Sequence, residues 1–202
     1  MTQANWRQKD FIITMWCPPP VTEENMAALE KDNYTLTGVT ADGDIESAKR
    51  NVLQQLDIAR KHRLKAFLFS GLLSPKTLDD PVKKAELDGL IDAVRKHPAL
   101  EGYHLIDEPG ATAFPDWGRL VSYLKQRDPA HLAYINLFPT YANQEQLGVA
   151  TPDKPNALLP YPGNLAGVGP NDQTVVLYNE HLAQFIEKSS PAPRRSGPKC
   201  RP

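Results

Sequence analysis

The sequence predicts an α/β fold in which short strands alternate with helices around a parallel sheet. Runs of β-branched and aromatic residues recur near positions 11, 34, 66, 103 and 133, at intervals of 23, 32, 37 and 30 residues. Between these runs, apolar residues recur at three- and four-residue steps, which is typical of helices that cross over a sheet. The 202 residues are 41% hydrophobic and 23% charged. This composition suits one domain with a buried core and excludes a fibrous or wholly disordered chain.

The first two strands and their helices are predicted from local signals. The first strand covers residues 11–16 and ends at three consecutive prolines, which cannot donate to a sheet ladder. A short helix follows from Thr22, whose hydroxyl is a typical N-cap, to about Asn33. The second strand covers residues 34–40. The next helix, residues 45–62, has an apolar face made of Ile45, Ala48, Val52, Leu56 and Ala59.

The same alternation continues to about residue 138. Strands are expected at 64–69, 102–106 and 132–138, with helices centred on residues 82–94 and 117–124 between them. After the last of these strands, residues 151–171 are rich in turn signals and are expected to form a long loop. One more helix is then expected at 173–188.

The last 14 residues differ in kind from the rest. Residues 189–202 contain no β-branched residue and no acid, and they are rich in proline and basic residues. Such a segment cannot bury enough apolar surface to fold. We therefore expect a folded domain over residues 1–188 and a disordered C-terminal tail over residues 189–202.

Two parallel architectures compete for the folded part. No glycine-rich phosphate loop follows the first strand, which disfavours a doubly wound nucleotide-binding sheet. A complete (β/α)8 TIM barrel needs about 250 residues. The expectation is therefore an incomplete (β/α)8 TIM barrel of about five βα units. Its open sheet edges would favour self-association.

Charge and cysteine content exclude several classes of function. The chain has 23 Lys+Arg against 24 Asp+Glu, a formal net charge of -1, so neither nucleic acid nor a membrane is an expected partner. The two cysteines, Cys17 and Cys200, form no disulfide framework and no zinc motif. Cys17 is expected to be a small buried hydrophobe. We expect no cofactor. The sequence has no signal peptide, so it predicts a cytoplasmic protein as written and leaves secretion open if the N-terminus is incomplete.

The strongest chemical signal is Asp107-Glu108-Pro109, directly after an expected strand. Ligands of parallel α/β folds bind at the carboxyl ends of the strands. Burial raises the pKa of a carboxyl group at the rim of a partly dry pocket. The group can then be protonated near neutral pH and donate its proton to a leaving oxygen. The alternative is structural: Asp107 caps the next helix and Glu108 is merely solvated.

Other side chains at strand ends are candidates for the same pocket. Trp16 is a candidate to stack on the ring of a ligand, with a place in the core as the alternative. Asn136 and Tyr141 are candidates to hydrogen-bond the ligand, although Asn136 has a structural alternative inside the barrel. His104 with Asp107 and Glu108 leaves a divalent-metal site open, provided that the strand stays regular as far as Glu108.

The segment Ile106-Asp107-Glu108-Pro109 resembles the acid/base motif of the TIM-barrel glycoside hydrolases of clan A, in particular β-galactosidase-like members. Two further segments, Phe11 to Pro20 and Tyr134 to Tyr141, resemble uncharacterised relatives of these hydrolases. The resemblance covers about residues 8–188 and implies that Glu108 is the general acid/base. Asp107 stands where the clan has a sugar-contacting asparagine. The clan's nucleophile ends strand seven, and no residue here matches it, which implies a truncated domain that is weakly active or inactive alone.

Three functions follow as hypotheses. The first is a glycoside hydrolase-like protein acting on O-glycosidic bonds of a carbohydrate. The second is a non-catalytic carbohydrate-binding pseudoenzyme module, and the third is a metal-dependent TIM-barrel enzyme. The sugar and its linkage are left open.

Overall fold

A four-stranded parallel sheet forms the centre of the protein in the computed structural model, which describes residues 6–149 and 173–189. The strands are β1 (Leu36–Thr40), β2 (Lys65–Phe69), β3 (Leu100–Asp107) and β4 (Leu132–Asn136). Their spatial order is the sequence order, β1-β2-β3-β4. A doubly wound sheet reverses its strand order at a switch point, whereas a (β/α)8 barrel does not. The expected α/β class and the partial-barrel arrangement are therefore confirmed.

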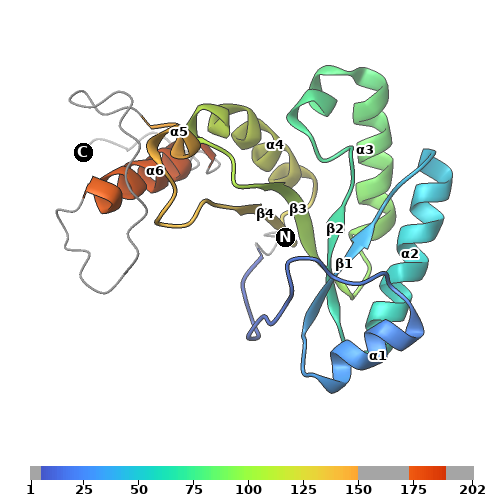
Figure 1. Ribbon diagram of the computed structural model, residues 1–202. Helices are drawn as coiled ribbons and strands as arrows, with labels where there is room; N and C mark the ends of the chain where they lie inside the picture. The colour runs from blue at the N-terminus through green and yellow to red at the C-terminus, as the bar shows by residue number, and fades with distance from the viewer. Residues whose placement is uncertain (1–5, 150–172, 190–202) are drawn as a thin grey trace, which may run out of the picture.

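Helices follow the strands and cover one face of the sheet (Figure 1). The three crossover helices are α2 (Ile45–Lys61), α3 (Pro81–Val94) and α4 (Phe114–Arg127). The first two begin at aspartates, Asp44 and Asp80, whose carboxylates accept hydrogen bonds from the first-turn amides. The remaining helices are α1 (Glu23–Lys31), α5 (Gln144–Leu147), α6 (Gln173–Ser189) and the short 3-10 turns η1 (Pro75–Asp79) and η2 (Ala111–Ala113).

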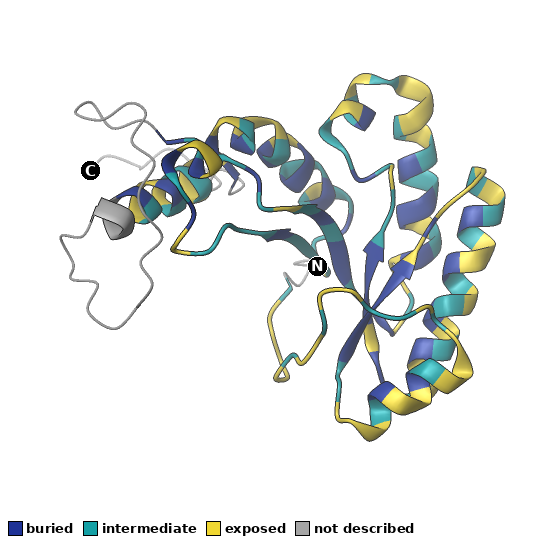
Figure 2. Cartoon of the chain, viewed as in Figure 1, coloured by how far each residue is buried: buried dark blue, intermediate teal, exposed yellow. Residues whose placement is uncertain are grey.

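The main core lies between this helical layer and the sheet. The helices turn their buried faces toward the strands, as Figure 2 shows. Val52 and Leu56 of α2, Leu90 of α3 and Leu120 of α4 are each fully buried against strand residues such as Leu68. Burial of these side chains stabilises the fold by roughly 1.5–3 kcal/mol each. The opposite face of the sheet has no such helical cover among the described residues.

The prediction of a first strand over residues 11–16 is wrong. The segment lies beside the start of β1, where the Ile13 carbonyl accepts hydrogen bonds from the backbone amides of Thr35 (3.0 Å) and Leu36 (3.2 Å). The Thr35 hydroxyl, rather than its carbonyl, accepts from the Ile13 amide at 2.8 Å. Because a side chain replaces the backbone acceptor, no ladder forms. The described residues therefore contain four strands, and Phe11 is 80% exposed.

Some expectations fall on other parts of the chain. The expected loop at 151–171 lies outside the described residues, as does the expected tail except for its first residue. That residue, Ser189, ends α6 and is buried. Of the helices that the structure describes, none combines the length and the apolar character that crossing a bilayer requires.

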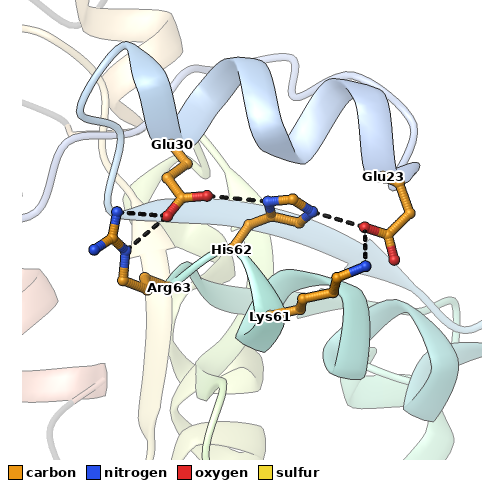
Figure 3. A network of polar contacts seen from close by, with 5 residues as sticks. All are labelled: Glu23, Glu30, Lys61, His62 and Arg63. Carbon is orange, nitrogen blue, oxygen red and sulfur yellow. Dashed lines mark hydrogen bonds and ion pairs between the residues drawn. The ribbon is translucent and has the colours of Figure 1, made fainter.

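A polar network joins α1 to the end of α2 (Figure 3). Both ring nitrogens of His62 lie within hydrogen-bond distance of carboxylates, Nε2 at 2.8 Å from Glu23 and Nδ1 at 3.0 Å from Glu30. Lys61 and Arg63 pair with the same two carboxylates. Two acceptors require both ring nitrogens to be donors, which only the imidazolium provides. The hydrogen bonds to Glu23 and Glu30 accordingly raise the pKa of His62.

Candidate functional site

A small cavity of about 80 Å³ lies on the face of the sheet that the helices leave uncovered. Its floor is made by alternate strand residues, among them Gly38 of β1, Phe67 and Phe69 of β2 and His104 of β3. Alternate residues of a strand share one face, so these side chains converge. Any side chain at position 38 would fill the floor, because a Cβ there would lie 2.9 Å from the ring of Phe69.

Aromatic rings surround the imidazole of His104. The ring of Phe69 stacks on it with centroids 4.4 Å apart, Tyr134 lies at 5.4 Å, and Trp16 meets it edge-on at 5.8 Å. Phe67 in turn stacks on Tyr134 at 5.1 Å. Burial among these rings lowers the pKa of His104 despite the nearby charge of Asp107. His104 is therefore a neutral, largely aromatic part of the floor at neutral pH.

A β-bulge brings a polar group to the same face. The register of β3 against β4 shifts between His104 and Ile106, so that Asp107 lies opposite Asn136. Asn136 Nδ2 donates to Asp107 Oδ1 at 2.9 Å, and the Tyr134 hydroxyl donates to Asn136 Oδ1 at 3.1 Å. Burial, followed by the charge of Asp107, raises the pKa of Tyr134 and keeps its hydroxyl protonated. These bonds fix the Asn136 amide in one orientation.

Glu108 occupies a left-handed turn directly after β3. Its φ is 47°, a conformation that costs a non-glycine residue about 1–3 kcal/mol. Its backbone amide donates to the carbonyl of Asn136 at 2.8 Å, which holds the turn against β4. The residue is half-buried, and its carboxylate forms no hydrogen bond or ion pair with another described side chain.

The structure contradicts the capping role considered for Asp107. The N-caps of the next two helical segments are Gly110 and Ala113, neither of which forms a side-chain cap. The Asp107 carboxylate instead takes its hydrogen bond from Asn136 across the sheet. The regular strand on which a metal site with His104 and Glu108 depended is interrupted by the bulge. Within residues 6–149 and 173–189, no three metal-ligand side chains gather.

The other expected site residues have different positions. Trp16 lines the cavity and is 56% exposed, which leaves much of its surface available to a ligand. Tyr141 lies five residues beyond β4, is 48% exposed and is not among the described lining residues. Cys17 is exposed rather than buried, because the proline-rich segment runs over the surface.

Sequence reasoning missed most of the aromatic floor. Phe67, Phe69 and Tyr134 received no role, although each occupies an alternate position of an expected strand. Period-two alternation was the signal that could have found them. The bulge at Leu105 places Asp107 on the same face as the site. No pattern in the sequence indicates this bulge.

Comparisons with known proteins give little further information. No family model matches the chain, and no curated protein matches it significantly. One solved structure that resembles it is a β-1,4-D-mannanase from Cryptopygus antarcticus, with a TM-score of 0.45 and 10% sequence identity. The overlap covers 59% of this chain and 50% of that chain, so this chain spans about half of the mannanase. An overlap of this extent identifies neither a family nor an activity.

Proposed function

We propose that the protein is glycoside hydrolase-like and binds a carbohydrate over the aromatic floor and the carboxyl ends of β3 and β4. One observation carries the proposal: the hydrogen-bonded row Tyr134, Asn136 and Asp107 lies beside exposed and half-buried aromatic rings. A sugar has apolar ring faces and polar hydroxyl edges. An aromatic platform next to fixed polar groups complements both.

Each group has a defined binding capacity. Asn136 Nδ2 has a second hydrogen beyond the one given to Asp107, and the Asp107 carboxylate has further acceptor sites. Together they can donate to one sugar oxygen and accept from a neighbouring hydroxyl. Trp16, 56% exposed, supplies a face for stacking. The hydrogen bond from Tyr134 keeps the Asn136 amide from turning over.

Glu108 is the proposed general acid/base. Its strained turn follows Asp107 directly, and its carboxylate has no competing partner among the described side chains. In its protonated form it would donate to the departing glycosidic oxygen. Retaining hydrolysis also needs a second carboxylate about 5–5.5 Å away, and no described residue is assigned that role. Slow hydrolysis, or binding without hydrolysis, is therefore the proposed behaviour of this chain.

Saccharide binding and turnover separate the possibilities. The chain is titrated with a set of β-linked oligosaccharides by calorimetry and incubated with matching aryl β-glycosides. We expect Asn136→Ala and Trp16→Ala to weaken binding about tenfold, and Glu108→Gln to keep binding but abolish any turnover. Phe11→Ala, which changes an exposed aromatic residue that does not line the small cavity, is the control.

The result has three informative forms. Turnover that Glu108→Gln removes supports a hydrolase, and binding without turnover supports a pseudoenzyme module. Turnover that a chelator removes would contradict the assignment in favour of a metal-dependent enzyme. Absence of binding to every saccharide would overturn the proposal.

A further inference from the structure

A second and larger cavity, of about 1050 Å³, opens at the amino-terminal edge of the sheet. The segment 6–12 and the residues that lead into all four strands line it, namely Thr35 before β1, Arg63 before β2, Lys96 and its neighbours before β3, and His131 before β4. Its volume is comparable to that of ordinary small-molecule sites. The polar groups of the proposed carbohydrate site lie at the opposite, carboxyl edge of the sheet, and Leu36 is the one described residue that lines both cavities.

The charge of this cavity differs from that of the whole chain. Six lysine and arginine side chains line it, against two carboxylates, whereas the complete chain has a formal net charge of -1. The six are Arg7, Lys9, Arg63, Lys65, Arg95 and Lys96. Positive side chains around one concave surface reinforce each other's potential.

Two of the six cations are neutralised by partners outside the cavity. Arg63 pairs with Glu30 at 2.6 Å, as Figure 3 shows, and Arg95 pairs with Asp92 at 3.1 Å. Neither is free to hold a ligand without giving up its carboxylate.

The other four cations have no carboxylate partner among the described residues. Arg7, Lys9 and Lys96 form no ion pair there, and Lys65 Nζ donates only to the neutral carbonyl of Pro98, at 2.6 Å. Of the two lining carboxylates, Glu101 accepts the indole N–H of Trp6 at 2.7 Å. The second, Asp10, forms no ion pair among the described residues. Four unpaired cations therefore face two unpaired carboxylates, and the lining keeps an excess of positive charge that comes from three separate segments.

We propose that this cavity binds a small anion carrying several phosphate groups. The four cations come from the N-terminal segment, from the first residue of β2 and from the turn before β3, so a singly charged anion would reach only some of them. A ligand with several phosphate oxygens in a row can engage donors from all three segments. Lysine and arginine are the side chains that bind phosphate most strongly, through charge-assisted hydrogen bonds.

Tripolyphosphate is the probe, titrated into the whole chain by calorimetry at low and at physiological salt. We expect binding that weakens with salt, because the cations are exposed and screened. In nitrogen-resolved spectra the indole signal of Trp6, which lines the cavity, is expected to shift, whereas those of Trp16 and Trp117 are not.

Charge-neutralising variants test the location. Arg7→Gln/Lys9→Gln changes only exposed side chains without hydrogen bonds of their own, and Lys65→Gln/Lys96→Gln changes the two cations next to the starts of β2 and β3. Each pair is expected to weaken binding about tenfold. The matched control, Lys76→Gln/Lys83→Gln, removes the same charge from exposed positions outside the cavity and is expected to change the affinity less than about twofold. Equal weakening by the control, or no binding of tripolyphosphate to the unaltered chain, would overturn the proposal.

Discussion

Removing the hydroxyl of Tyr103 tests how a buried charge is held inside this fold. Tyr103 is fully buried in β3, and its hydroxyl donates to Asp128 Oδ2 at 2.6 Å. His131 Nδ1 lies 2.7 Å from the same oxygen, and Asp128 is only 4% exposed. A buried hydrogen bond to a charged group contributes about 1.5–3 kcal/mol. Tyr103→Phe is therefore expected to lower the free energy of unfolding by about 2 kcal/mol.

Urea unfolding followed by circular dichroism measures this loss. With an m-value of about 2–3 kcal/mol/M for a chain of this size, the midpoint is expected to fall by about 0.7–1 M. Tyr34→Phe is the control, because the hydroxyl of Tyr34, half-buried before β1, has no hydrogen bond to another described residue. A loss below about 0.5 kcal/mol for Tyr103→Phe, or the same loss for both variants, would refute the reasoning.

The change in the free energy of unfolding at acidic pH can also be predicted. Burial alone would raise the pKa of Asp128, but the hydrogen bonds from His131 and Tyr103 hold it below its usual value. A lowered folded-state pKa gives stability that is present above the unfolded pKa of about 3.9 and is lost as the pH falls through the folded one. Tyr103→Phe raises the folded pKa. The variant is therefore expected to lose this contribution at a higher pH than the unaltered chain.

Three further outcomes are expected. The pKa of His62, followed by NMR, should lie above the ordinary value of about 6.5, and Glu23→Gln should lower it. The stability that this pair contributes is fully present below the pKa of His62 in the unfolded chain and is lost as the pH rises through its pKa in the folded chain. A loss of stability in Glu23→Gln that is larger at high pH than near neutral pH would contradict this account. Gly102→Ala should cost more than about 2 kcal/mol in thermal or urea unfolding, because its Cβ would overlap the backbone oxygen of Leu132. A near-neutral result would count against the β3–β4 register. Leu90→Ala, fully buried in α3, should cost about 2.7–5 kcal/mol by the same assay, and a cost under 1 kcal/mol would contradict its place in the core.

The sequence predicted the helical layer and the last four strands well because their signals are local. The apolar stripe on α2 and the run of apolar residues in β3 identify buried faces without knowledge of the rest of the fold. The prediction of a strand over residues 11–16 was wrong because β-branched and aromatic content does not reveal which hydrogen-bond acceptors the neighbouring strand presents. There, the Thr35 hydroxyl takes the place of the backbone acceptor that a ladder needs.

The candidate site was predictable in part. Position after a strand was enough to select Asp107, Glu108 and Asn136, and the structure places two of them in one hydrogen bond. The bulge that turns Asp107 toward Asn136 depends on how β3 and β4 pair, which is a tertiary property. The basic cavity was also beyond the sequence, because its cations are distant in the chain and the overall charge is close to zero.

Binding of a β-linked oligosaccharide, followed at the side-chain amide of Asn136 by NMR, tests the central claim most directly. The two amide hydrogens should have separate signals, since one is held by Asp107. Saccharide is expected to shift the signal of the other hydrogen, and Asp107→Ala to abolish this response. Shifts confined to residues remote from the aromatic floor, or none with any saccharide, would contradict a carbohydrate site at the carboxyl ends of β3 and β4.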